Sequence, residues 1–219
     1  DAHVWREVQP AFDGEVHIPD LREAASIQAM VDRSLACSQA SEIILIGHSM
    51  GARVAMEAAR QAPQRVKRLV LISTGSHPLA PSELANRQAI TALSREKGIE
   101  ALAAHWLPGM VWAGNLDRSV LMDGLTAMVC RMDPSIHARQ IQALINRPDA
   151  SSYLSELRQE TLLLVGREDR WSPVTQHTYM ANKLPHSQLR IIEEAGHFLP
   201  LEQGEKTAQA LRQFLSPHD

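Results

Sequence analysis

Residues 42–61 constrain the fold more than any other stretch, because a short apolar run leads through G-x-S-x-G into a helical pattern. Residues 42–46 are rich in β-branched side chains, which is typical of a strand buried on both faces of a parallel sheet. Beyond Ser49 the apolar residues recur at helical spacing. The sequence therefore predicts a sharp strand-to-helix turn at Ser49, with Gly47 and Gly51 allowing strand and helix to approach closely.

Such a turn would lift the Ser49 hydroxyl above the sheet, where it can act as a nucleophile. It would also direct the backbone N–H of Met50, at the positive end of the helix, toward any group bonded to Ser49. We expect that N–H to form half of an oxyanion hole. A serine hydroxyl also needs a base to accept its proton and an acid to orient that base.

Two later apolar runs end in an acid and a histidine, in the chain order that this chemistry requires. Residues 161–165 lead into a loop that contains Asp169, and residues 188–192 lead into a loop that contains His197. Ser172-Pro173 is typical of a helix N-cap followed by the first helical residue, which leaves Asp169 in the loop. The adjacent Glu168 is the fallback acid.

Three motifs resemble those of the α/β-hydrolase superfamily, and the resemblance covers nearly the whole chain. They are Gly47-His48-Ser49-Met50-Gly51, Gly166-x-x-Asp169-x-x-x-Pro173 and Ala195-Gly196-His197-x-x-Pro200-x-Glu202. The resemblance implies a three-layer α/β-hydrolase fold with a mostly parallel sheet. It also implies that Ser49 is the nucleophile, His197 the general base and Asp169 the residue that orients His197.

The first residues resemble the family segment that follows an early central strand and the oxyanion loop. By this resemblance, the first strands and the loop with the second oxyanion N–H would precede Asp1 and are absent from the given chain. A signal peptide upstream of Asp1 stays open for the same reason. Glu15 to Asp20 is expected to form a short strand.

Strand signals stop between residues 78 and 150, where we expect four helices over residues 82–97, 99–106, 116–131 and 134–146. The resemblance implies a small helical cap here, which divides the chain into a first core part (1–77), a cap insertion (78–150) and a second core part (151–219). Several large apolar residues are either core or the wall of an apolar substrate pocket: Trp106, Met110, Trp112, Trp171 and Phe198.

Composition limits the remaining possibilities. With 219 residues, 44% of them hydrophobic, one core-forming unit is expected. The net charge of −3 comes from charges of mixed sign, and no apolar run reaches membrane-spanning length, so neither a nucleic-acid partner nor a membrane is expected. The two cysteines favour a reducing compartment, which we take to be the cytoplasm. No metal or organic cofactor is expected, and the protein would be a monomer or a homodimer.

The sequence thus predicts a serine hydrolase that cleaves small to medium carboxylic esters through an acyl-enzyme intermediate. Lactones, carbon–carbon bonds of diketones and thioesters are alternative targets of the same three residues. A further alternative is a ligand-binding or degenerate member of the superfamily with negligible turnover.

Overall fold

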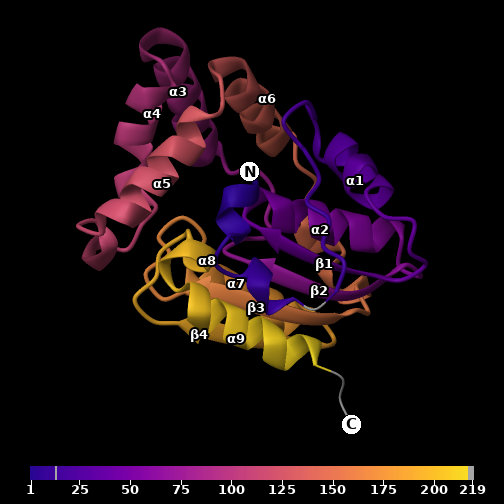
Figure 1. Cartoon of the computed structure of the whole chain (residues 1–219). Coiled ribbons are helices and arrows are strands. Elements are labelled where there is room, and N and C mark those ends of the chain that lie inside the picture. Colours follow the sequence, from indigo (N-terminus) through magenta and orange to yellow (C-terminus); the bar gives the residue numbers. More distant parts are fainter. Residues whose placement is uncertain (13, 217–219) are drawn as a thin grey trace.

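The computed structural model describes residues 1–12 and 14–216 of the chain, and in this part four parallel strands form one sheet (Figure 1). The strands lie side by side in chain order: β1 (Ile43–His48), β2 (Val66–Ile72), β3 (Glu160–Gly166) and β4 (Ser187–Ile192). β2 and β3 occupy the centre of the sheet, and their apolar side chains are almost completely buried. The three apolar runs of the sequence analysis, at residues 42–46, 161–165 and 188–192, correspond to β1, β3 and β4.

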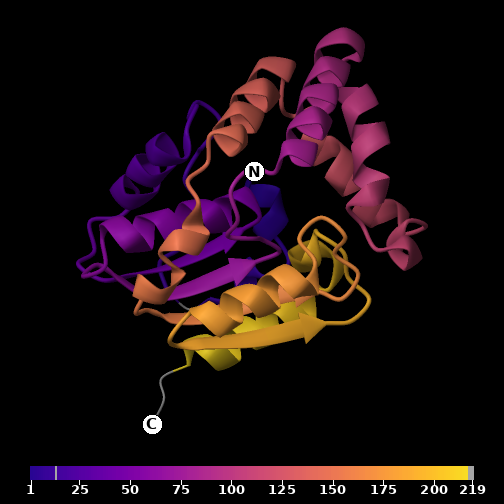
Figure 2. The same ribbon diagram turned by 180° about the vertical axis from the view of Figure 1, so that it is seen from behind.

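Helices cover both faces of the sheet (Figures 1 and 2). On one face, α2 (Met50–Gln61) and α7 (Val174–Lys183) pack through Met56 and Met180 against Leu71 and Leu163 of the central strands. On the other face, α9 (Gly204–Leu215) packs against β2 and β3. α1 (Ile27–Ala36) lies against α2. The arrangement confirms the expected three layers of helix, sheet and helix.

The chain between β2 and β3 contains α3 (Pro81–Lys97), α4 (Ile99–Trp106), α5 (Ser119–Cys130) and α6 (Pro134–Ile145), which stand above the sheet in Figure 2. α4 has the predicted bounds. η4 (Ala113–Asn115) is a separate 3-10 turn, and α5 begins three residues later than predicted because the backbone of Arg118 is not helical (φ −79°, ψ 87°). A shared apolar cluster joins α4 and α5. The division into a cap and two core parts remains a prediction.

Short helical turns complete the described chain. They are the 3-10 turns η1 (Ala2–Trp5), η2 (Gln9–Ala11), η3 (Leu107–Gly109), η5 (Ala150–Ser152) and η6 (Leu154–Glu156), and the short helix α8 (Leu199–Glu202). The sequence predicts one C-terminal helix over residues 201–215. The structure divides that region into α8 and α9, because the backbone of Gln203 is not helical (φ −133°, ψ 57°).

Two expectations about strands are wrong. Residues 15–20 belong to no strand, and β1 is not buried on both faces, since its Ile44 side chain is 45% exposed. In the described chain β1 pairs with β2 along one edge only, and its other edge borders a cavity that residues 14–21 also line. An extended segment becomes a strand only when a neighbouring strand supplies hydrogen-bond partners, and within residues 1–12 and 14–216 no strand pairs with residues 15–20.

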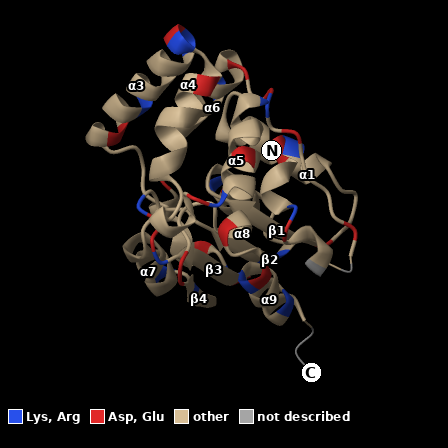
Figure 3. Ribbon diagram, turned by 60° about the vertical axis from the view of Figure 1, so that its left-hand side comes forward, with Lys and Arg blue, Asp and Glu red and all other residues tan. Residues whose placement is uncertain are grey.

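Acidic and basic residues are interspersed over the molecule (Figure 3). Cys37 and Cys130 are free thiols. Within residues 1–12 and 14–216, no helix combines the length and the apolar character needed to cross a membrane.

Candidate active site

Ser49 occupies the sharp turn between β1 and α2, with a backbone conformation (φ 55°, ψ −115°) that few residues other than glycine adopt. Its N–H donates to the carbonyl oxygen of Ile72 on β2 (2.9 Å). A Cβ at Gly47 would lie 2.4 Å from the carbonyl oxygen of Gly51, so glycine is required there. The same expectation for Gly51 is wrong, because a Cβ at that position would meet no atom within 4 Å.

Three side chains from the carboxyl ends of separate strands form one hydrogen-bonded set, which we call the Ser49–His197–Asp169 set. His197 Nε2 lies 2.8 Å from Ser49 Oγ, and His197 Nδ1 lies 3.0 Å from Asp169 Oδ2. The side chains of His197 and Asp169 are 3% and 0% exposed. The structure therefore brings together the three residues that the sequence nominated from positions as far as 148 residues apart.

The Asp169 carboxylate is held by the backbone of its own loop. Its Oδ1 atom accepts hydrogen bonds from the N–H groups of Trp171 (2.9 Å) and Ser172 (2.8 Å). Burial raises the pKa of Asp169, but the charge and hydrogen bond of His197 together with these N–H groups outweigh that effect and leave the pKa below its ordinary value. The carboxylate is therefore ionised at neutral pH. α7 begins at Val174, and Ser172 is not its N-cap as the sequence had predicted.

Glu202, which is 3% exposed, shapes the loop that carries His197. Its Oε2 atom accepts from the N–H of Gly196 (3.0 Å), and its Oε1 atom accepts from the N–H of Phe198 (3.1 Å). Oε2 also accepts from the N–H of Trp112 (2.8 Å) and from Asn115 Nδ2 (3.1 Å), on the segment between α4 and α5. Glu202 thus fixes the backbone on both sides of His197 and ties it to the inserted helices.

We expect Glu202→Gln to lower kcat by about 10- to 100-fold with a small change in KM, because an amide NH₂ cannot accept these N–H hydrogen bonds. Leaving buried donors unpaired costs about 1–3 kcal/mol each and would let His197 shift. Steady-state kinetics well below the melting temperature, together with urea unfolding, measure the two effects. Glu205→Gln is the matched control, since Glu205 is exposed and pairs only with Arg212. Equal kinetics for both variants would contradict this positioning role.

His48 and His177 support the same loops. His48 Nε2 lies 2.7 Å from the carbonyl oxygen of His197, so it carries the proton and donates it. His177 Nε2 accepts from the N–H of Thr74 (3.1 Å), and Thr74 Oγ1 donates to the carbonyl oxygen of Ser49 (3.0 Å). Burial lowers the pKa of His48 to about 3 and that of His177 to about 4.

A third histidine, His137, is partly buried, and this burial lowers its pKa to about 4. An unfolded histidine titrates near pH 6.5, so in a window around pH 5 the unfolded chain binds nearly three more protons than the native protein. Stability should therefore fall as the pH falls through this window, by about 4 kcal/mol per pH unit where all three titrate. Urea unfolding at graded pH measures this slope.

The matched variants for the pH dependence are His137→Asn and His186→Asn. His137→Asn removes one of the three histidines, so the slope of stability against pH should fall by about a third. The second removes an exposed histidine and should leave the slope unchanged. A stability that is constant between pH 7 and pH 4.5 would show that the three side chains do not stay neutral in the folded protein.

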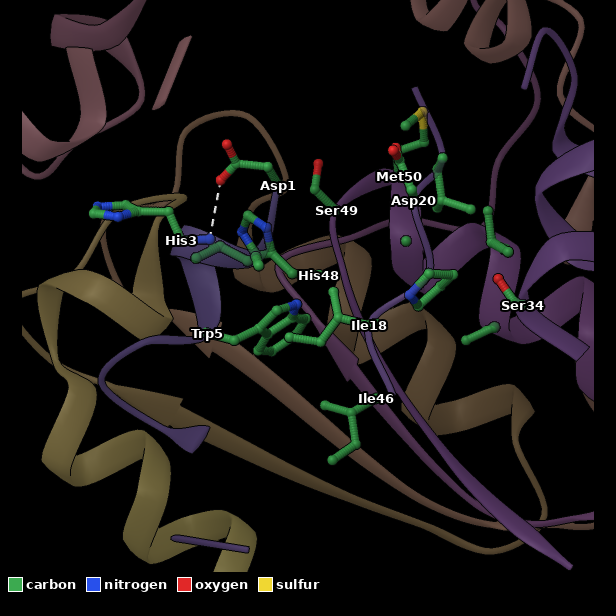
Figure 4. A pocket seen from close by; sticks show the side chains of 18 of the residues that line it. Asp1, His3, Trp5, Ile18, Asp20, Ser34, Ile46, His48, Ser49 and Met50 are labelled. Carbon is green, nitrogen blue, oxygen red and sulfur yellow. Dashed lines mark hydrogen bonds between the residues drawn. The ribbon is translucent and has the colours of Figure 1, made fainter. Parts of the chain in front are cut away.

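A cavity of about 1710 Å³ reaches from the open edge of β1 to the inserted helices, and Ser49, Met50 and His197 line it. In Figure 4 the Ser49 hydroxyl lies between Asp1 and Met50 and points away from Ile46. The wall includes four of the large residues that the sequence nominated: Trp106, Met110, Trp171 and Phe198.

Trp112 is not among the residues that line the cavity, so its prediction as a pocket residue is wrong. Its ring packs against Gly114, where a Cβ would lie 2.5 Å from the ring, and its N–H belongs to the Glu202 hydrogen bonds. Among the described residues, no group of three or more histidine, cysteine, aspartate or glutamate side chains is arranged to hold a metal ion.

Comparison with known proteins places this geometry in a family. Residues 1–210 match the profile of the Alpha/beta hydrolase family. Among curated relatives, 2-hydroxy-6-oxononadienedioate/2-hydroxy-6-oxononatrienedioate hydrolase 2 of Pseudomonas putida is 28% identical over 176 residues, which are 78% of this chain and 62% of that protein. The 2-hydroxymuconate semialdehyde hydrolase of Pseudomonas putida is 28% identical over 80% of this chain and 63% of its own length. The chain thus spans less than two thirds of the length of these relatives.

Solved structures agree with this assignment. A thermophilic esterase from Thermogutta terrifontis, in a malate-bound structure, superposes with a TM-score of 0.86 at 28% identity, covering 98% of this chain and 85% of that one. The enol-lactonase from Burkholderia xenovorans LB400 shares the fold, with a TM-score of 0.85 at 18% identity over 99% of this chain and 87% of that one. The family match, the parallel sheet and the strand-to-helix turn at Ser49 lead to one conclusion: the chain belongs to the α/β-hydrolase family.

Proposed function

We propose that this chain is a serine hydrolase that cleaves small to medium carboxylic esters. The observation that carries the proposal is the continuous hydrogen-bonded path from Ser49 Oγ through His197 to the ionised carboxylate of Asp169. Because Asp169 accepts at Nδ1, the neutral imidazole carries its proton there and leaves Nε2 free to accept the Ser49 proton.

In the first half of the reaction, Ser49 Oγ attacks the ester carbonyl carbon while its proton passes to His197 Nε2. Negative charge develops on the carbonyl oxygen, and the backbone N–H of Met50 at the start of α2 donates to it. The imidazolium of His197 is stabilised by the Asp169 carboxylate. His197 then gives its proton to the departing alcohol oxygen as the carbon–oxygen bond breaks, which leaves an acyl group on Ser49.

In the second half, His197 accepts a proton from a water molecule, and the resulting hydroxide attacks the acyl carbon. The bond to Ser49 Oγ breaks, and Ser49 recovers a proton from His197 as the carboxylic acid leaves. Asp169 remains ionised throughout, in keeping with the depressed pKa of its carboxyl. The cycle uses only side chains and backbone groups of the Ser49–His197–Asp169 set and its neighbour Met50.

The apolar side chains that line the cavity favour a substrate with an apolar acyl or alcohol group of modest size. Trp106 lies edge-on to Phe198, with ring centroids 5.9 Å apart, and Phe198 directly follows His197. Met110 lines the cavity as well, and its carbonyl oxygen accepts the N–H of His197 (2.7 Å). We infer that the inserted helices act as a cap whose apolar side chains select the substrate by shape. The free thiols of Cys37 and Cys130 support a reducing compartment such as the cytoplasm.

Hydrolysis of a carbon–carbon bond is the second candidate. The relatives in Pseudomonas putida are named as hydrolases of oxo-dienedioates and of a muconate semialdehyde, and such chemistry can use the same serine, histidine and aspartate. Lactone hydrolysis is supported by the fold of the enol-lactonase alone. The ester proposal is preferred because the esterase structure covers a larger share of this chain at the same identity as those relatives.

A fluorophosphonate probe followed by intact mass measurement tests the proposal, beside p-nitrophenyl esters of graded chain length and 2-hydroxy-6-oxononadienedioate. We expect one adduct on Ser49 and turnover of short esters. Turnover of the dienedioate without turnover of the esters would favour the second candidate. A folded protein that neither reacts with the probe nor hydrolyses any of these compounds would be a ligand-binding or degenerate member, and both candidates would fall.

A further inference from the structure

A cluster of three arginines surrounds one glutamate beside the inserted helices. Arg87 on α3 donates to Glu83 Oε1 through Nε (2.8 Å) and Nη2 (2.5 Å). Arg147, after α6, donates to Oε1 (3.0 Å) and Oε2 (2.6 Å) of the same carboxylate. Arg53 on α2 shares the carbonyl oxygen of His77 with Arg147, at 3.1 and 3.2 Å. The side chains of Arg87 and Arg147 are 5% and 1% exposed.

The charges of this arginine cluster do not balance. Among the described residues, Glu83 is the one carboxylate in ionic contact with these arginines, so two positive charges remain without a partner. Burial and then the positive charge of Arg147 lower the pKa of Arg53 to about 9. Burial and then the charges of Arg53 and Arg147 also lower the pKa of His77. A positive potential of this kind in a water-poor site attracts an anion.

Arg147 makes the most extensive connection between the two ends of the insertion. Arg147 donates to the carbonyl oxygens of Pro78 (3.0 Å) and Leu144 (2.8 Å), which lie where the chain enters and leaves the insertion. Its two bonds to Glu83 engage both carboxylate oxygens. This fork–fork pair already neutralises Glu83, so it leaves the positive charges of Arg87 and Arg53 unbalanced.

The arginine cluster lies next to the Ser49–His197–Asp169 set. Arg87 lines the same cavity as Ser49 and His197. Its guanidinium carbon is 5.7 Å from the centroid of the Trp171 ring, and Trp171 donates its N–H to Asp169. Arg53 lies one helical turn beyond Ser49, to whose carbonyl oxygen its N–H donates (3.4 Å). A group bound at Arg87 would therefore share the cavity with the reacting bond.

We propose that Arg87, with Arg53 and Arg147 behind it, forms a subsite for a carboxylate of the substrate, so that the enzyme prefers esters that carry a second, ionised carboxyl group. The inference rests on the proposed hydrolase function and names its substrate class. Among the described residues, the hydrogen bonds of Arg87 use Nε and Nη2, which leaves Nη1 for the ligand. The carboxylate would supply the negative charge that the arginine cluster lacks.

Two pairs of esters that differ only in charge test this subsite. The first pair is mono-p-nitrophenyl glutarate and its methyl ester, with the charge on the acyl part. The second pair is 4-(butanoyloxy)benzoate and its methyl ester, with the charge on the leaving group. For at least one pair we expect wild-type kcat/KM to favour the anion by about tenfold or more, the size expected for a hydrogen bond to a charged group. No preference in either pair would overturn the proposal.

Substitution of Arg87 then tests whether this side chain causes the preference for the anionic ester. Arg87→Met should remove it, lowering kcat/KM for the anionic ester by about 10- to 100-fold while the neutral ester changes little. Arg87→Lys, which keeps the charge and loses the planar fork, should retain part of it. Arg95→Met is the matched control, because Arg95 is an exposed residue on the same helix. Equal losses for the charged and neutral esters would mean that Arg87 is only structural.

A binding measurement separates failure of the subsite from failure of the proposed function. Glutarate and the uncharged glutaramide are titrated calorimetrically into Ser49→Ala and into the Ser49→Ala, Arg87→Met double variant. Binding of glutarate that is at least tenfold tighter than that of glutaramide, and that is lost in the double variant, would support the subsite even if no ester were hydrolysed. Equal binding of the two compounds would overturn the subsite and leave the hydrolase proposal untouched.

Discussion

Ser49→Ala should lower kcat for any ester by about 10⁵-fold or more, because the alanine side chain has no hydroxyl with which to form the acyl-enzyme. The fold should persist, since the Ser49 hydroxyl has His197 as its hydrogen-bond partner and the backbone bond from Ser49 to Ile72 does not involve the side chain. The measurements are the rate of p-nitrophenol release, the mass after treatment with the fluorophosphonate probe, and the melting temperature.

The control for this variant is Ser76→Ala. Ser76 is also buried, but its hydroxyl lies against that of Ser151 (3.2 Å), away from His197. We expect it to keep the probe adduct and most of the turnover. If Ser49→Ala hydrolysed esters as fast as the wild type, the assignment of Ser49 as nucleophile would be wrong.

Asp169→Asn should lower kcat by about 10³- to 10⁴-fold while the protein stays folded. An amide at this position can donate an N–H to His197 Nδ1, which would favour the imidazole tautomer with its proton on Nε2. That tautomer cannot accept the Ser49 proton. The loss should not recover as the pH rises, since the substituted group has no carboxyl to ionise. Steady-state rates from pH 6 to pH 9 measure both points.

Glu168→Gln provides a matched acid-to-amide control one residue away. Glu168 Oε2 accepts the N–H of Ala195 (3.0 Å), and a glutamine oxygen can accept the same bond. Its kcat should therefore stay within a few-fold of the wild-type value. If Glu168→Gln were the damaging change and Asp169→Asn the harmless one, the catalytic acid would be Glu168.

Much of the fold follows from local patterns in the sequence. The helix after Ser49 has the predicted bounds, 50–61, because its apolar face and the residues at its end are both local signals. The strands at 160–166 and 187–192 are found within one residue of each predicted end for the same reason. The errors occur where an element depends on a distant neighbour. Residues 15–20 have strand-like composition but no partner strand, and Gly51 has the expected residue type without the expected crowding.

In the candidate site, too, some features follow from local motifs and others depend on distant contacts. Its three principal residues follow from motifs, since each stands in a loop after an apolar run. Glu202 belongs to the histidine motif, but the sequence does not reveal that one carboxylate accepts N–H groups from Gly196, Phe198 and the distant Trp112. Within the arginine cluster, the i,i+4 spacing of Glu83 and Arg87 is a local signal. The sequence gives no sign that Arg53 and Arg147, 94 residues apart, share the carbonyl oxygen of His77.

The sequence by itself determined the family and the tight passage from strand to helix at Ser49, and it predicts the order of nucleophile, acid and base along the chain. These depend on short stretches in which residue type decides the backbone geometry. Only the tertiary structure decided which side chains share the cavity, why His48 and His177 stay neutral, and where positive charge gathers. Those properties arise from burial and from contacts between segments far apart in the chain, and the free energy of a charge depends on what surrounds it in space.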